Sequence, residues 1–331
     1  MKATINELFQ QKLFSRHQAS EMLVNMTNGT FSSAQTAALL ATFQVRGITV
    51  DELAGFRDAL RDMCLRVNLS EFDTIDLCGT GGDGKDTFNI STLASFVTAA
   101  AGIKVSKHGN YGVSSVCGSS NILEYYGYRF SADTCKLKRE LDQAGICFLH
   151  APLFNIAMKN VADVRKQLGV RTIFNMLGPL VNPSFPKAQM VGVFSAELAR
   201  IYAYLFQQED KPFAVVYSLD GYDEVSLTSP FKFFSNKGEE LIDPEDLHLP
   251  ELDECDLAGG TTVEESAQLF LRIIKGEGSS VQNAVVSANA GIAISVKTPS
   301  KSMEECIGIA REVIESGKAY KSFETLMNLN R

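Results

Sequence analysis

The spacing of apolar residues along the chain is helical before about residue 70. Apolar positions recur every three to four residues between Ala19 and Met26, and no convincing strand pattern occurs over 1–70. Ser32 and Thr49 each precede a Gln or Glu by three positions, which is the capping-box signature of a helix start. The pattern predicts a four-helix N-terminal domain over 1–70.

After residue 70 the pattern changes to short apolar runs separated by helical stretches. The runs lie at 74–77, 103–106, 146–149, 190–194 and 213–217. Such alternation is typical of strand-helix units around a mostly parallel central sheet. The sequence therefore predicts an α/β fold, with the small helical domain followed by a larger α/β domain over 71–331.

Further helices are expected inside and after this region. The uncharged stretch from Thr87 to Ile103 carries too many polar residues for a membrane span and is expected to be a buried helix. Helical patterns also occupy 157–168, 263–275, 284–293 and 302–316. The segment near 157–185 is punctuated by prolines, and we expect it to return to the N-terminal helices.

Composition restricts the classes of partner. The chain has 331 residues, 45% apolar and 21% charged, with a net charge of -8, so it is globular and its field disfavours nucleic acid and anionic membranes. The seven cysteines form no Cys-x-x-Cys pair, which excludes a zinc or disulfide framework. Lys12 interrupts any secretory apolar segment, so we expect a cytoplasmic protein. Any phosphate has to be held by local groups.

The stretch 76–84 after the first predicted strand contains four glycines in six residues. Glycines let the backbone approach a ligand and turn N–H groups inward, and the polar residues of 87–92 can lie at the N-terminus of the next helix. The spacing matches neither a dinucleotide fingerprint nor a Walker loop. The alternatives are a phosphate cradle and a flexible turn with ordinary helix capping.

A second cluster, 107–119, follows the second predicted strand. It places Lys107 before glycines and serines, which together supply a fixed cation and several N–H and O–H donors. Loops after neighbouring parallel strands meet at the carboxyl edge of the sheet, where α/β proteins bind ligands. One ligand with two separated phosphate groups would satisfy both loops.

Two further motifs carry chemistry. Asp223 and Glu224 are adjacent carboxylates, which by themselves indicate a solvated turn but beside two phosphate loops suit Mg²⁺. Arg165 shares a helical face with Met158 and Val161. Its guanidinium is either a solvated surface group or a bidentate partner for the carboxylate of a flat substrate.

Together these motifs resemble one family. The matching segments are GTGGDGKDTFNIST (79–92), KHGNYGVSS (107–115), VRKQLGVRTIFNMLGPLVNP (164–183) and GYDEVS (221–226). They resemble the anthranilate phosphoribosyltransferases of tryptophan biosynthesis, whose fold is shared with pyrimidine nucleoside phosphorylases. The resemblance implies transfer of phosphoribose from 5-phosphoribosyl-1-pyrophosphate (PRPP) to the amine of anthranilate, with Mg²⁺, in a homodimer formed through the helical domain.

The resemblance also implies roles for individual residues. The catalytic set would be Lys107, Asp223 and Glu224, and Mg²⁺ would be bound by Ser91, Asp223 and Glu224. The first loop would bind pyrophosphate through Gly79, Gly82, Asp83, Thr87, Asn89, Ile90, Ser91 and Thr92. Lys107 would serve the phosphates, and the loop from Gly112 to Ser119, with Val113, Ser114 and Ser115, would hold the 5-phosphate end. His108, Gly109, Asn110 and Tyr111 would be further substrate-binding residues, with His108 and Met158 near the path of anthranilate. Anthranilate would meet Gly79, Asn110 and Arg165.

The chain also departs from the family pattern at a few positions. Asn155 and Ile156 stand where the family commonly has His-Pro, Asp86 replaces a common Asn, and 119–121 reads Ser-Ser-Asn for Ser-Ala-Asp. Two alternatives compete with the transferase. A nucleoside phosphorylase would carry Lys-x-Ser-Gly-Arg at 107, and a silent nucleic-acid-binding paralogue would have a basic surface and eroded metal ligands.

Overall fold

The computed structural model of the protein describes residues 2–112 and 115–330. The chain folds into two compact units, which are described separately. Unit 1 ends its first segment at Arg66 and resumes from Ala151 to Pro183, whereas unit 2 holds Val67–His150 and continues from Ser184. The sequence places the corresponding boundaries at 70, 157 and 185.

Unit 1 contains the four helices predicted for the N-terminal segment. They are α1 (Lys2–Phe9), α2 (Arg16–Thr27), α3 (Ser33–Arg46) and α4 (Val50–Met63). The capping boxes predicted at Ser32 and Thr49 are both formed, and a third begins α2 at Ser15. Because each box satisfies backbone N–H groups at both of its positions, the sequence fixes where these helices begin.

The second segment of unit 1 packs on these helices. It forms α8 (Ala151–Phe154), α9 (Lys159–Leu168) and α10 (Ile173–Leu177), with 3-10 turns at Ile156–Met158 and Gly178–Leu180. Helix α9 contacts α2 and α3, and its Asn160 Nδ2 donates to the Thr27 carbonyl over 2.6 Å. Gly169 ends α9 in the left-handed conformation, directly after the helical pattern at 157–168.

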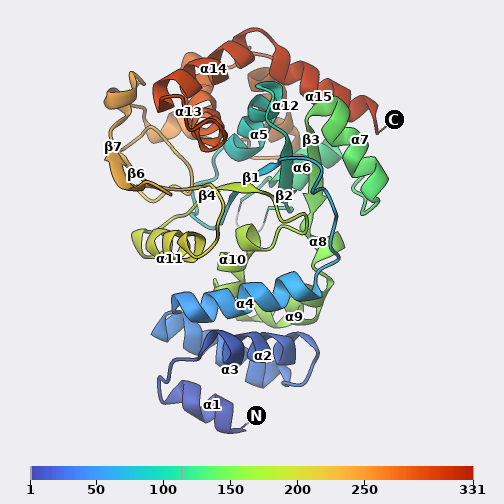
Figure 1. Cartoon of the computed structure of the whole chain (residues 1–331), viewed down its shortest axis with the longest axis vertical. Helices are drawn as coiled ribbons and strands as arrows, with labels where there is room; N and C mark the ends of the chain where they lie inside the picture. Colours follow the sequence, from blue (N-terminus) through green and yellow to red (C-terminus); the bar gives the residue numbers. More distant parts are fainter. Residues whose placement is uncertain (1, 113–114, 331) are drawn as a thin grey trace. The chain divides into compact units, whose positions relative to one another are not determined.

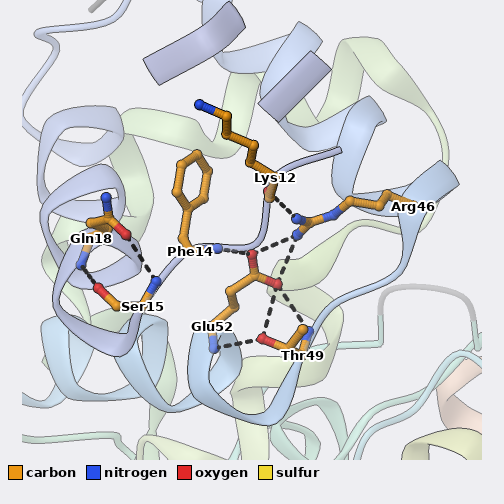
Figure 2. A network of polar contacts seen from close by, with 7 residues as sticks. All are labelled: Lys12, Phe14, Ser15, Gln18, Arg46, Thr49 and Glu52. Atoms are coloured by element: carbon orange, nitrogen blue, oxygen red, sulfur yellow. Dashed lines mark hydrogen bonds and ion pairs between the residues drawn. The ribbon is translucent and has the colours of Figure 1, made fainter. Parts of the chain in front are cut away.

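A buried carboxylate joins three parts of unit 1 (Figure 2). Glu52, with a fully buried side chain, accepts two hydrogen bonds from Arg46 Nη2 at 2.7 Å and one from the backbone N–H of Phe14 at 2.9 Å. Thr49 donates to it from its backbone N–H and its hydroxyl at 3.0 and 3.1 Å. The capping glutamate of α4 therefore also fixes the end of α3 and the linker before α2.

Unit 2 is built on a seven-stranded sheet within the described residues (Figure 1). The strands are β1 (Ile75–Gly79), β2 (Val105–Gly109), β3 (Ile146–His150), β4 (Ala188–Gly192), β5 (Phe213–Ser218), β6 (Phe231–Ser235) and β7 (Gly238–Ile242). Their order is β3-β2-β1-β4-β5-β6-β7, and the first five are parallel. The mostly parallel sheet of the sequence analysis is confirmed.

Helices cover both faces of this sheet. They are α5 (Ile90–Ala100), α6 (Ser119–Tyr125), α7 (Thr134–Ala144), α11 (Ala196–Gln207), α12 (Val263–Ile274), α13 (Ser280–Lys297), α14 (Met303–Glu315) and α15 (Lys318–Asn328), with 3-10 turns at Pro244–Leu247 and Glu254–Leu257. Helices α5 and α13 pack together on one face, and α11 contacts β5 on the other (Figure 1). The uncharged stretch at 87–103 thus contains the buried α5.

The structure differs from the sequence-based elements at several bounds and in some unpredicted elements. β2 begins at Val105 and not at Ile103, because the Ile103 N–H is used by the Thr98 carbonyl at the end of α5. Strand β4 begins two residues early and ends two residues early. The hairpin β6–β7 and helix α15 are not among the predicted elements; the second strand of the hairpin, β7, is acidic and largely exposed and lacks the apolar signal of a strand.

Among the described helices, none combines the length and the apolar character that crossing a bilayer requires.

Replacing Arg46 with Met tests the buried network of unit 1. The substitution leaves the Glu52 carboxylate buried without its cation, so we expect the free energy of unfolding to fall by about 3–5 kcal/mol. Arg66→Met is the matched control, because Arg66 is 60% exposed in its pair with Asp62 and such pairs contribute about 1 kcal/mol or less. Urea unfolding followed by circular dichroism measures both; equal losses would contradict the assignment.

Candidate active site

The glycine-rich loop leaves the carboxyl end of β1 and leads into α5. Gly81, Gly82 and Gly84 have φ values of 63°, 79° and 78°, a region that side chains with a Cβ rarely enter. Asn89 is the N-cap of α5, and Ser91 and Thr92 lie in its first turn. The strand, turn and helix start predicted for this stretch are therefore present, and the glycines are needed by the backbone conformation.

The Asp223–Glu224 pair lies directly against this loop. The Gly81 N–H donates to Asp223 Oδ2 over 2.6 Å, and the Ser91 N–H donates to Glu224 Oε1 over 3.2 Å. A Cβ on Gly79 would stand 2.5 Å from Asp223 Oδ2, and one on Gly192 would stand 1.5 Å from the Asp223 carbonyl oxygen. Glycine at these two strand ends is what allows the pair to approach.

Two polar residues that the sequence analysis did not select hold the pair in place. Asn289, 3% exposed in α13, accepts the Val225 N–H at 3.1 Å and donates to the Val225 carbonyl at 2.9 Å. Ser218 Oγ, at the end of β5, donates to the Glu224 carbonyl over 2.6 Å. The detectable signal for Asn289 was an amide inside an otherwise apolar helix.

Burial leaves the two carboxyl groups poorly solvated. Burial first, and then the charge of Asp83, raise the pKa of Asp223 to about 7. Burial, followed by the charges of Asp223 and Asp83, raises the pKa of Glu224 well above its usual value, and Lys107 opposes the shift. Glu224 Oε2 is buried and has no hydrogen-bond partner among residues 2–112 and 115–330. A small pocket is lined by Gly79, Ser91, Gly192 and this acidic pair, among other residues.

The side chain of Lys107 is buried and does not lie on the surface of the phosphate loop. It is 1% exposed on β2, and its Nζ donates to the Leu77 carbonyl of β1 over 2.6 Å. His108, next to it, is also buried, and its N–H donates to Asp76 Oδ1 over 3.0 Å. The Lys107 charge is thus held below the loop and acts on the site through space.

The second loop is closed by Asn121 at the start of α6. Asn121 Oδ1 accepts the N–H groups of Gly112 and Gly118, each over 3.0 Å. A Cβ on Gly118 would meet the Gly112 nitrogen at 2.3 Å, so the two ends of the loop touch. Ser115 and Ser119 lie in this turn, whereas Val113 and Ser114 lie outside the described residues.

The two loops are joined to each other. Asn89 Nδ2 donates to the Cys117 carbonyl over 2.9 Å, and the Val116 N–H donates to Asp86 Oδ1 over 3.2 Å. Thr87 pairs with Ala258 in an isolated bridge, which fixes the end of the first loop. The structure therefore brings the predicted site residues of unit 2 together at the carboxyl edge of β1 and β2.

Arg165 belongs to unit 1. Its guanidinium stands 5.3 Å above the Phe174 ring, and burial lowers its pKa. No carboxylate within the described part of the chain forms an ion pair with it. A partly desolvated cation on an aromatic ring is a suitable partner for a planar carboxylate.

The carboxylates of Asp223 and Glu224 have the chemistry of ligands for a metal ion. In the described ranges, no three or more His, Cys, Asp or Glu side chains cluster as a ready-made metal cage. The fit rests on the unpartnered Glu224 Oε2 next to Asp223, since Mg²⁺ is commonly held by one or two carboxylates plus substrate phosphates.

Comparisons with known proteins place this site in a family. Residues 2–64 match the helical bundle domain and residues 71–320 the a/b domain of a glycosyl transferase family. The chain is 53% identical, over all of both sequences, to an anthranilate phosphoribosyltransferase of Christiangramia forsetii. The chain belongs to the anthranilate phosphoribosyltransferase family.

Solved structures of this family agree with the fold. The Thermus thermophilus anthranilate phosphoribosyltransferase has a TM-score of 0.93 at 34% identity and covers 99% of both chains. The Saccharomyces cerevisiae enzyme, solved in complex with PRPP and Mg, has a TM-score of 0.90 at 24% identity and covers 99% of this chain and 97% of its own. The resemblance and the fold class expected from the sequence are confirmed.

Proposed function

We propose that the chain carries out the reaction of its family. It transfers the 5-phosphoribosyl group of PRPP to the amine of anthranilate, giving N-(5-phosphoribosyl)anthranilate and pyrophosphate, in tryptophan biosynthesis. The observation that carries this assignment is the close approach of the Asp223–Glu224 pair to a glycine loop that is itself tied to a second loop. Two loops of backbone donors beside buried carboxylates suit a ligand with two phosphate groups.

The first loop binds the pyrophosphate end of PRPP. The positive end of the α5 dipole lies near Ser91 and Thr92 and favours an anion at the start of this helix. Gly79, Gly82, Asp83, Thr87, Asn89 and Ile90 complete this side. The second loop binds the 5-phosphate through Gly109, Asn110, Tyr111, Gly112 and Ser115 to Ser119, with Val113 and Ser114 included from the sequence.

Asp223, Glu224 and Ser91 hold Mg²⁺ in this proposal. The buried Glu224 Oε2, which has no described hydrogen-bond partner, supports this metal site. A buried carboxylate oxygen without a donor destabilises the fold unless a cation binds it. When bound, Mg²⁺ supplies positive charge to the leaving pyrophosphate.

The protein's own contribution is positioning and charge. The arylamine of anthranilate is the nucleophile at ribose C1, so the chain needs no nucleophile of its own. As the C1–O bond to pyrophosphate breaks, negative charge grows on the leaving group and positive character on the sugar. Loop N–H groups and the buried Lys107 charge stabilise that leaving group, and such preorganised donors lower the barrier to its departure.

In unit 1, Arg165 binds the carboxylate of anthranilate, with Met158 as a further contact of this substrate. The support is its desolvated guanidinium, which has only the Phe174 ring as a described partner.

The seven cysteines of the chain are free thiols. Free thiols suit a reducing compartment, so we place the enzyme in the cytoplasm.

The enzyme is a homodimer through the helical unit in this proposal. Phe9, Leu13 and Val45 are 54%, 66% and 89% exposed, although each is a large apolar residue of unit 1. They lie close together, because α1 contacts α3 and the Arg46 guanidinium bonds the Lys12 carbonyl over 2.6 Å. An exposed apolar patch of this kind suits a self-association surface.

Loss of anthranilate fluorescence on addition of PRPP and Mg²⁺ tests the function. We expect the folded protein to consume anthranilate, and Glu224→Gln to lower kcat by about 100-fold or more because a charged ligand at the leaving-group site is lost. Glu240→Gln, on the exposed strand β7, is the matched control and should keep the normal rate. Unchanged fluorescence with folded wild-type protein contradicts the proposal.

Arg165→Met tests the anthranilate site. We expect KM for anthranilate to rise about 10- to 100-fold, because a charged hydrogen bond to the substrate carboxylate contributes about 1.5–3 kcal/mol. KM for PRPP should stay the same. Lys166→Met, an exposed neighbour on α9, is the control in the same steady-state assay. An equal rise for both variants, or a rise in KM for PRPP alone, would argue against this role.

Val45→Glu tests the dimer. Sedimentation velocity should give twice the chain mass for the wild type and the single-chain mass for the variant, since a carboxylate buried in an apolar interface is strongly unfavourable. Leu241→Glu places the same charge on an exposed residue of unit 2 and should leave the dimer intact. A monomeric wild type would sink the proposal.

A further inference from the structure

His150 is a buried histidine at the end of the first chain segment of unit 2. It is the last residue of β3, and the chain passes into the second segment of unit 1 at Ala151. Its register partner on β2 is Gly109, directly before the second loop. Only 6% of His150 is exposed, so its ring is part of the interior of unit 2.

Three contacts fix the orientation of this ring. It stacks on Phe130 with 4.4 Å between ring centres and 20° between planes, and the Tyr111 ring meets it edge-on at 4.8 Å. Its Nδ1 lies 2.8 Å from Ser120 Oγ in a buried hydrogen bond. Apolar packing and one polar contact therefore define a single ring position.

Two of these neighbours belong to the two ends of the second loop. Tyr111 follows Asn110 at the loop start, and Ser120 lies in the first turn of α6 at its end. The Ser120 N–H and the Ser119 hydroxyl both donate to the Asn110 carbonyl, over 3.1 and 3.3 Å. The imidazole thus contacts both ends of the loop at the point where they are joined.

We propose that His150 is a positioning residue for the two described ends of the second loop, Asn110–Gly112 and Ser115–Ser120. Its imidazole holds Tyr111 and Ser120 so that the loop keeps the closed form in which Gly112 and Gly118 share Asn121 Oδ1. His150 takes no part in bond making or breaking. The identity of the ligand, PRPP, rests on the proposed function, whereas the contacts of His150 with the loop do not depend on it.

The protonation state of His150 matters to this role. Burial lowers the pKa of His150, and Glu124 of α6, the charged group acting on the ring, opposes that shift. The Glu124 carboxylate also accepts the Tyr111 hydroxyl over 3.2 Å. Because the folded pKa lies below the usual 6.5, the unfolded chain binds more protons, and the contribution of His150 to loop stability falls as pH drops below about 6.5.

Three variants separate the hydrogen bond from the ring. His150→Phe keeps an aromatic ring and removes the bond, Ser120→Ala removes only its partner, and His150→Asn places an amide where Nδ1 was. We expect the first two to raise KM for PRPP about five- to tenfold, with kcat within about twofold, as for loss of one buried hydrogen bond. The double variant should be no worse than either single one, because both remove the same interaction.

Hydrogen exchange gives a readout that does not depend on activity. Peptides that cover Asn110 to Gly112 and Ser115 to Asn121 should exchange faster in His150→Phe and Ser120→Ala, and His150→Asn should restore part of the protection. Lowering the pH from 7 to 5.5 should raise KM for PRPP more in the wild type than in His150→Asn; the titration of PRPP itself is common to both. His17→Asn, on the exposed surface of α2, is the control.

The outcomes separate the two proposals. A wild type that does not consume anthranilate overturns the proposed function, and the exchange arm then still tests His150. A wild type that is active, with exchange and KM for PRPP unchanged in His150→Phe and Ser120→Ala, overturns the positioning role. Multiplying effects in the double variant also overturn it, because they would mean that His150 and Ser120 act separately.

Discussion

Burial of two adjacent carboxylates against backbone N–H groups is the constraint on which unit 2 is organised. Two like charges in a poorly solvated place repel each other, so the fold has to supply donors and close contact. Gly79 and Gly192 leave the space, and Asn289 and Ser218 fix the backbone of the Asp223–Glu224 turn. Each of these residues comes from a different element of the same α/β unit, so the turn depends on the whole sheet being formed.

The buried glutamate of unit 1 shows what a structural carboxylate looks like in the same chain. Glu52 receives bonds from Arg46, Phe14 and Thr49, so its burial is fully compensated. Glu224 Oε1 accepts one described hydrogen bond and Oε2 accepts none. The Lys107 cation, which acts on Glu224, donates its hydrogen bond to the Leu77 carbonyl. A buried carboxylate oxygen without a hydrogen-bond partner destabilises the folded protein, and a bound cation is the simplest way to compensate it.

The sequence was sufficient where one residue type has one physical use. The capping boxes at Ser32 and Thr49 predicted helix starts because those side chains bond only their own helix end. The glycines of 79–84 predicted a tight turn between strand and helix, and Gly81, Gly82 and Gly84 have positive φ values that other residues rarely adopt. The hairpin β6–β7 was missed because its edge strand is acidic and exposed, and Asn289 and His150 were missed because their partners lie 64 and 30 residues away.

An acidic chain can thus hold an anionic substrate without a basic surface. In the proposed function the donors of both loops are mainly backbone N–H groups, which carry no net charge and need no side-chain ordering on binding. The backbone of the second loop is held by bonds to a side chain, since Asn121 Oδ1 accepts the N–H groups of Gly112 and Gly118. In formal charges, Lys107 and the three carboxylates Asp83, Asp223 and Glu224, which act on one another, sum to -2, and one divalent cation would balance that charge. The net charge of -8 disfavours polymeric phosphate, whereas the proposed function needs only a small polyphosphate that binds together with its metal.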